Sequence, residues 1–89
     1  MKCFQITISG KVQGVGFRYS AKSFARALGI NGIVRNLPHY EVYIEAEGNE
    51  FQLNEFIKWC KTGPEHARVT NVFVSECELK EYSSFEVVP

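Results

Sequence analysis

The chain has 89 residues and a formal net charge of zero, with ten Lys and Arg against ten Asp and Glu. A chain of this length forms one domain, residues 1–89, with a single core two layers thick. The charge balance argues against a nucleic-acid-binding surface, and no apolar stretch is long enough to cross a bilayer. We therefore expect a cytoplasmic protein that binds neither nucleic acid nor membrane.

The first predicted elements are a strand and a helix joined by a glycine-rich loop. Apolar and polar side chains alternate over residues 3–9, which is typical of a half-buried strand. Three glycines follow within residues 10–16. Apolar side chains then recur at the helical period up to Gly29, a typical stop signal, so we expect a helix over residues 17–28.

The rest of the chain predicts four strands and a second amphipathic helix, most of them separated by turns that contain Gly, Pro or Asn. In chain order these elements are a strand over residues 32–37, a strand over 42–47, a helix over 53–60, a strand over 69–77 and a short edge strand over 84–88. Both helices need an apolar surface to cover, and one face of the sheet supplies it. With right-handed crossovers, the order β-α-β-β-α-β gives an α+β, ferredoxin-like sandwich with an antiparallel or mixed sheet and both helices on one face.

The loop before the first predicted helix is the candidate binding site. Its glycines let backbone N–H groups approach a ligand closely, and a helix N-terminus favours an anion. Arg18 stands at the start of the helix, and its planar guanidinium suits phosphoryl oxygens. The spacing matches neither a Walker loop nor the dinucleotide fingerprint, in which Tyr19 would have to be glycine. By spacing alone, a phosphate site and a tight turn with a surface arginine are equally supported.

The residues of four segments together resemble the acylphosphatase family. The segments are Gly10-Lys11-Val12-Gln13-Gly14-Val15-Gly16-Phe17-Arg18, Gly32-Ile33-Val34-Arg35-Asn36-Leu37-Pro38, Glu47-Gly48 and Gly63-Pro64-Glu65-His66-Ala67-Arg68-Val69. The resemblance covers essentially the whole chain at the usual family length, and its first motif is specific. It also implies the ferredoxin-like fold that the order of elements predicts.

What the resemblance implies is an enzyme that hydrolyses small acyl phosphates to carboxylate and phosphate, without metal, cofactor or covalent intermediate. In this interpretation Arg18 binds the phosphoryl group and Asn36 holds the attacking water. The phosphoryl oxygens also accept hydrogen bonds from loop backbone N–H groups, those of Val12, Gln13, Gly14, Val15, Gly16, Phe17 and Arg18. An asparagine suits the water-holding role because it can donate and accept hydrogen bonds at once and stays uncharged at every pH. At this size a monomer is the expected state.

One turn departs from the family pattern. After the second motif the family usually has Asp-Gly, and His39-Tyr40 stands there in this chain. Glycine adopts a positive φ in such a turn readily, whereas Tyr40 does so only at a cost. We therefore expect a turn that is shaped differently or is more mobile, with an effect on the rate rather than on the reaction. His39 and His66 are expected to be surface residues.

Two other classes of function share this fold. The first is a non-catalytic anion-binding module, like the N-terminal domain of hydrogenase-maturation carbamoyltransferases. There a proline typically follows the arginine of the first motif, whereas Tyr19 follows Arg18 here and the sequence stops at Pro89, so we expect the free-standing enzyme. The second is an RNA-binding domain with aromatic side chains on the open sheet face. Tyr43 is the candidate, but neighbouring Glu residues would repel a phosphate backbone.

The remaining polar and sulfur-containing residues are expected to be structural. Cys60 fits the apolar stripe of the second helix, and Ser20 and Ser23 have no histidine nearby in the sequence. Cys3 and Cys77 lie in strands that can be neighbours, although a reducing cytosol disfavours a disulfide. The other expected surface groups are the helix cations Lys22 and Arg26 and a solvated acidic edge of Glu45, Glu47 and Glu50.

Overall fold

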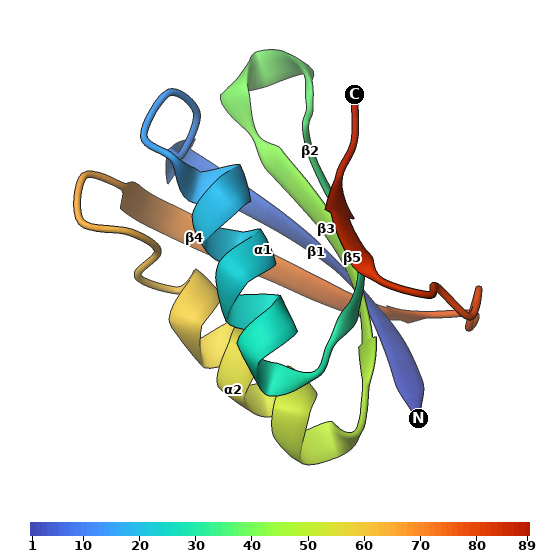
Figure 1. Ribbon diagram of the computed structural model, residues 1–89. Helices are drawn as coiled ribbons and strands as arrows, with labels where there is room; N and C mark the ends of the chain where they lie inside the picture. The colour runs from blue at the N-terminus through green and yellow to red at the C-terminus, as the bar shows by residue number, and fades with distance from the viewer.

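The computed structural model describes all of residues 1–89. One sheet forms the back of the molecule, and both helices lie side by side on one of its faces (Figure 1). The elements, in chain order, are β1 (Lys2–Lys11), α1 (Phe17–Leu28), β2 (Asn31–Asn36), a 3₁₀ turn (Pro38–Tyr40), β3 (Val42–Gly48), α2 (Glu50–Cys60), β4 (Arg68–Cys77) and β5 (Phe85–Val87).

The sheet has five strands in the order β4-β1-β3-β2-β5. β1 pairs antiparallel with β3 and β4, and β2 pairs antiparallel with β3. The short β5 pairs in parallel with β2 at the edge of the sheet. The sheet is therefore mixed, and the predicted ferredoxin-like order, with a short C-terminal edge strand, is confirmed.

The core lies between the sheet and the helices. The alternating apolar residues of the inner strands supply one side, and the apolar stripes of α1 and α2 supply the other. Fully buried members from both layers include Ile6, Ile8, Phe17, Ala21, Ala25, Val34, Ile44, Leu53, Phe56 and Cys60. Burial raises the pKa of the Cys60 thiol, so it stays protonated and acts as a small apolar side chain, as expected.

The two helices begin in different ways. α2 starts at Glu50 rather than near residue 53, because Asn49 caps it: the Asn49 side chain accepts from the backbone N–H of Gln52, and the Gln52 side chain accepts from the backbone N–H of Asn49. α1 starts after Gly16, which has φ 78° and offers no side chain to cap the helix. The start of α1 thus leaves its backbone N–H groups without the partners that α2 has.

The expected acidic edge is wrong for two of its three members. Glu45 and Glu47 lie on the sheet face opposite the helices but are only 9% and 4% exposed. The segment between β4 and β5 covers them: the carboxylate of Glu47 accepts hydrogen bonds from the backbone N–H groups of Lys80, Glu81 and Tyr82, at 2.6, 3.2 and 2.9 Å. Only Glu50 is exposed. The acids therefore fasten a chain segment to the sheet.

Glu45 is held by side chains instead of backbone. The hydroxyl groups of Tyr43 and Tyr82 each donate to it at 2.6 Å, and Lys80 Nζ lies 3.0 Å away. Burial alone would raise the pKa of Glu45, but the hydrogen bonds from Tyr43, Tyr82 and Lys80 outweigh it and lower the pKa. Burial and the same carboxylate raise the pKa of Tyr43 to about 12. Tyr43 is therefore a donor to Glu45 on the open face.

The structure also contains a disulfide that the sequence analysis disfavoured and two ion pairs that it did not predict. Cys3 and Cys77 face each other across β1 and β4 and form a disulfide in the structure. Lys22 and Arg26, expected to be solvated, both pair with Glu86 of β5, with nitrogen–oxygen distances of 3.5 and 3.0 Å. Partly exposed pairs of this kind stabilise a protein by about 0–1 kcal/mol each. Their effect is to fasten the edge strand to α1.

Candidate active site

The glycine-rich loop and the β2–β3 turn lie at the same end of the sheet, next to the start of α1 (Figure 1). The loop is fixed at both ends by buried side chains, since Val12 and Phe17 are each 1% exposed. Between them Gly14 and Gly16 have φ values of 75° and 78°, a region that favours glycine. The loop therefore bends sharply while its ends are held in the core.

The backbone N–H groups of residues 12–18 donate to no acceptor within the protein. The first intrahelical bond of α1 runs from the N–H of Ser20 to the carbonyl of Gly16. No side chain caps the helix, and its first turn contains no acidic residue. Unpaired N–H groups at a helix start carry partial positive charge and suit an anion. All the loop residues predicted to bind phosphate are brought together in this segment.

Arg18 lies in the first turn of α1 and forms no ion pair or hydrogen bond with another protein group. The other arginine of this helix, Arg26, pairs with Glu86. The guanidinium carbon of Arg18 lies 5.9 Å from the centre of the Tyr19 ring. Since no carboxylate occupies its donors, Arg18 has all of them available for a ligand anion.

Asn36 is the last residue of β2. It follows the buried Val34 by two residues, and side chains two apart in a strand point to the same face. The side chain of Asn36 therefore lies on the sheet face that the helices cover. Its Oδ1 atom is buried and has no hydrogen-bond partner in the protein, and no other buried side-chain nitrogen or oxygen shares this property. Such an unpaired acceptor costs about 1–3 kcal/mol and calls for a specific explanation.

Gln13 links the loop to the turn that follows Asn36. Its side-chain Nε2 donates to the carbonyl oxygens of Leu37, at 3.0 Å, and Glu41, at 2.8 Å. The sequence indicated a role only for the backbone of Gln13, and nothing in its spacing identified this bridge. Gln13 therefore sets the position of the β2–β3 turn, and of the neighbouring Asn36, relative to the loop.

The β2–β3 turn has a left-handed backbone at two consecutive residues, neither of which is glycine. Tyr40 has φ 68°, and His39 before it has φ 65°. The turn is closed by a hydrogen bond from the N–H of Leu37 to the carbonyl of Glu41, at 2.8 Å, and Ser9 donates to the Glu41 carboxylate at 2.9 Å. The chain holds both residues of this turn in the left-handed region although neither is glycine.

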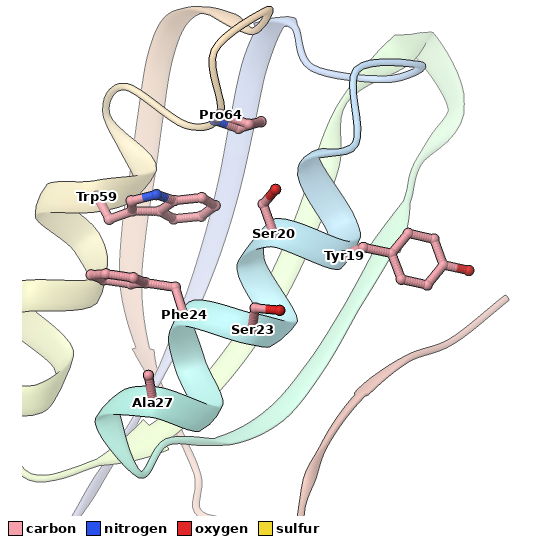
Figure 2. Close-up of a pocket in the computed structure, with 7 residues that line it drawn as sticks. All are labelled: Tyr19, Ser20, Ser23, Phe24, Ala27, Trp59 and Pro64. Atoms are coloured by element: carbon pink, nitrogen blue, oxygen red, sulfur yellow. The ribbon is translucent and has the colours of Figure 1, made fainter.

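A separate groove runs between α1 and α2 and is not part of this site. Figure 2 shows Ser20 and Ser23 on α1, with the ring of Phe24 stacked under that of Trp59 and Ala27 further down α1. No histidine or carboxylate lines this groove, so nothing there activates either serine. The groove therefore gives neither serine a catalytic partner.

No group of three or more His, Cys, Asp or Glu side chains is placed to hold a metal ion. Neither helix has the length and apolar character that crossing a membrane requires.

The fold and the loop together define an α+β ferredoxin-like domain with an uncapped helix start that suits an anion. The model of the acylphosphatase family matches residues 4–87. The chain therefore belongs to the acylphosphatase family, and it is an enzyme of this type.

Full-length relatives and solved structures agree with this assignment. An acylphosphatase from Archaeoglobus fulgidus is 49% identical over 98% of both chains. The crystal structure of acylphosphatase from Bacillus subtilis superposes with a TM-score of 0.97, at 36% identity and full coverage of both chains. The crystal structure of full-length HypF contains a similar region, with a TM-score of 0.89 and 36% identity, which covers 99% of this chain but 12% of that one. Because the relatives of matching length are acylphosphatases, the non-catalytic alternative is not favoured.

Proposed function

We propose that the chain, acting as a single domain over residues 1–89, hydrolyses the carboxyl–phosphate bond of small acyl phosphates. The observation that carries this proposal is the unpaired, buried Oδ1 atom of Asn36 beside a loop whose backbone N–H groups have no protein partner. A water molecule and a phosphoryl group are the two species that these unsatisfied atoms suit. Substrate binding would supply the hydrogen bonds that the fold leaves unmade.

In this mechanism the phosphoryl oxygens accept hydrogen bonds from the backbone N–H groups of residues 12–18 and from the guanidinium of Arg18. These donors neutralise the charge that the phosphoryl group carries in the transition state. Asn36 Oδ1 accepts a hydrogen bond from the attacking water and so orients the water oxygen toward phosphorus. A bond forms from the water oxygen to phosphorus, and the bond from phosphorus to the acyl oxygen breaks.

No strong base is required for this reaction. The leaving group is a carboxylate, whose conjugate acid has a pKa of about 4, so it departs without protonation. The proton of the water passes to an oxygen of the phosphate product. Positioning and charge stabilisation supply most of the rate enhancement in such transfers. We therefore infer a reaction that uses no metal and no cofactor.

We infer in addition that the protein acts as a monomer in the cytoplasm, where the reducing environment would keep the thiols of Cys3 and Cys77 unpaired, and that it binds neither nucleic acid nor membrane. The zero net charge supports the absence of a nucleic-acid surface. The acids that border Tyr43 support it as well, since Glu45 lies directly beside this aromatic side chain on the open face.

Release of phosphate from benzoyl phosphate, measured with EDTA present, tests the proposal. The wild type is expected to be active, and Arg18→Ala to lose about a thousandfold in kcat/KM because charge stabilisation by an arginine has this magnitude in phosphoryl transfer. The matched control is Arg26→Ala, an arginine of the same helix that pairs with Glu86 and lies outside the site. Near-normal activity of Arg18→Ala, or inhibition of the wild type by EDTA, would contradict the mechanism.

A further inference from the structure

A shallow groove adjoins the glycine-rich loop, called the phosphate loop from here on, on the side of the β2–β3 turn. Gly10, Lys11, Val12, Gln13 and Tyr40 line it, and its volume is about 400 Å³. We call it the acyl groove. It shares Val12 and Gln13 with the loop whose backbone N–H groups are unpaired. A molecule with its phosphoryl group on that loop would therefore have the groove next to it, and the volume is that of a small-molecule site.

Tyr40 is the one aromatic side chain of this groove, and its conformation is unfavourable in two ways. It is 78% exposed, so its ring gains little from burial. Its φ of 68°, directly after His39 at 65°, places two consecutive non-glycine residues in the left-handed region. That conformation costs about 1–2 kcal/mol per residue. Outliers of this kind cluster where they serve ligand binding.

The turn that carries Tyr40 is held firmly against the loop. Gln13 Nε2 donates to the carbonyls of both Leu37 and Glu41, the residues on either side of the turn. Ser9 Oγ donates to the Glu41 carboxylate from β1. The ring is thus presented on a backbone fixed to the phosphate loop itself, which limits the entropy lost when a ligand contacts it.

We propose that the acyl groove binds the acyl group of the substrate and that Tyr40 makes the enzyme selective for flat, aromatic acyl groups. This inference rests on the proposed function, since it places the second half of the same substrate. The ring of Tyr40 offers an apolar face, and the rest of the lining comes from Gly10, Lys11, Val12 and Gln13. An acetyl group is too small to cover this surface, whereas a benzoyl group covers it.

The test compares kcat/KM for benzoyl phosphate and acetyl phosphate in the wild type, Tyr40→Asn, Tyr40→Phe and Phe51→Asn. Asparagine tolerates a positive φ, so it removes the ring while the turn is kept. Tyr40→Asn is expected to lower kcat/KM for benzoyl phosphate about fivefold to tenfold, through KM, and to change the value for acetyl phosphate less than about twofold. Tyr40→Phe keeps the ring and should keep the wild-type ratio. Phe51→Asn removes a ring that is 70% exposed on α2 and should change neither substrate.

Equal losses on both substrates in Tyr40→Asn would overturn the proposal, because they would show that Tyr40 acts through the turn and Asn36. An unchanged ratio would overturn it as well. Phenacylphosphonate and acetonylphosphonate are counterparts of benzoyl and acetyl phosphate that cannot be hydrolysed. Measuring their binding distinguishes a failure of the acyl-groove proposal from a failure of the proposed enzymatic function. If the wild type hydrolyses neither substrate but binds phenacylphosphonate more tightly, and Tyr40→Asn removes the difference, the acyl groove stands and the enzymatic proposal fails.

Discussion

The two helices of this protein begin with opposite solutions to the same problem. Each helix start exposes backbone N–H groups that have no partner within the helix. At α2 the side chains of Asn49 and Gln52 close a capping box, with both hydrogen bonds at 2.8 Å, and Glu50 adds a negative charge. At α1 the capping position is Gly16, with no side-chain bond and no acid in the first turn. One helix start is completed by its own residues, and the other is left open.

A third segment shows that the chain can bind its own backbone with a carboxylate. Glu47 accepts from three consecutive N–H groups, those of residues 80–82, and is buried by them. A carboxylate near residues 12–18 would occupy the loop in the same way and compete with a substrate phosphate. The chain therefore satisfies exposed backbone N–H groups with its own side chains at α2 and at residues 80–82, and leaves those of residues 12–18 without an acceptor.

After Arg18→Ala, the largest expected effect is at Asn36, the last residue of β2 beside the uncapped start of α1. Asn36→Ala removes the proposed water ligand and should lower kcat about a hundredfold or more, the size of effect seen when one preorganised polar group is lost. Inhibition by inorganic phosphate should stay near the wild-type value, since the loop and Arg18 are untouched. The free energy of unfolding should change little, because removal of the unpaired Oδ1 offsets the lost packing.

Steady-state kinetics, phosphate inhibition and urea unfolding of Asn36→Ala check these three expectations together. A loss of phosphate affinity as large as the loss of kcat would make Asn36 a phosphate ligand instead. A fall in stability that accounts for the lost activity would make it a structural residue.

The next largest effect is a loss of stability when Glu47, the acceptor for the N–H groups of residues 80–82, is removed. Glu47→Ala leaves three backbone N–H groups of residues 80–82 without their acceptor and should reduce the free energy of unfolding by about 3 kcal/mol. Urea unfolding measures this change, and Glu65→Gln, at an exposed acid, is the control. Activity below the unfolding temperature should persist, because Glu47 lies on the sheet face away from the helices. A loss below about 0.5 kcal/mol would mean that water replaces the carboxylate at no cost.

A smaller effect is expected when the cap of α2 is removed. Asn49→Ala breaks the capping box and should lower stability by about 1 kcal/mol. Gln52 keeps its second bond, from Nε2 to the carbonyl of Leu28 at 2.8 Å, so the helix should persist. Thermal unfolding and kcat/KM of the same preparation test the comparison directly. If Asn49→Ala reduced activity as well as stability, the two helix starts would not be functionally distinct.

The sequence predicts the fold well because the fold depends on local periodicity. Alternation and helical spacing locate all the strands and both helices, whereas the start of α2 was placed three residues late because Asn49 and Gln52 interact through their side chains. The burial of Glu45 and Glu47 was not predictable, since alternation shows which face a side chain occupies and not which distant segment covers it. The segment in question is more than thirty residues further along the chain.

The site divides in the same way. Glycine spacing and a helix start point to an anion site near Arg18, but only the family resemblance identified Asn36, which otherwise reads as a turn residue before Pro38. The bridge from Gln13 to Leu37 and Glu41 carried no sequence signal, because a glutamine side chain can reach many partners and its choice depends on the folded turn. The family pattern places a glycine at position 40, and from its absence we expected a turn that is shaped differently or is more mobile; the structure shows a positive φ at Tyr40.

The smallest expected effect returns to that turn. Tyr40→Gly places at φ 68° the residue that adopts this conformation without steric cost, and it should raise the free energy of unfolding by up to about 1 kcal/mol, less the greater entropy of glycine in the unfolded chain. Urea unfolding detects a gain of this size, and turnover of acetyl phosphate should be unchanged. If stability rises while selectivity for benzoyl phosphate falls, Tyr40 costs the fold stability and provides a ring that binds the substrate. Gly16 is comparable, since it leaves the start of α1 uncapped where a ligand can bind. No gain in stability would mean that the greater entropy of glycine in the unfolded chain cancels the relief of strain at position 40.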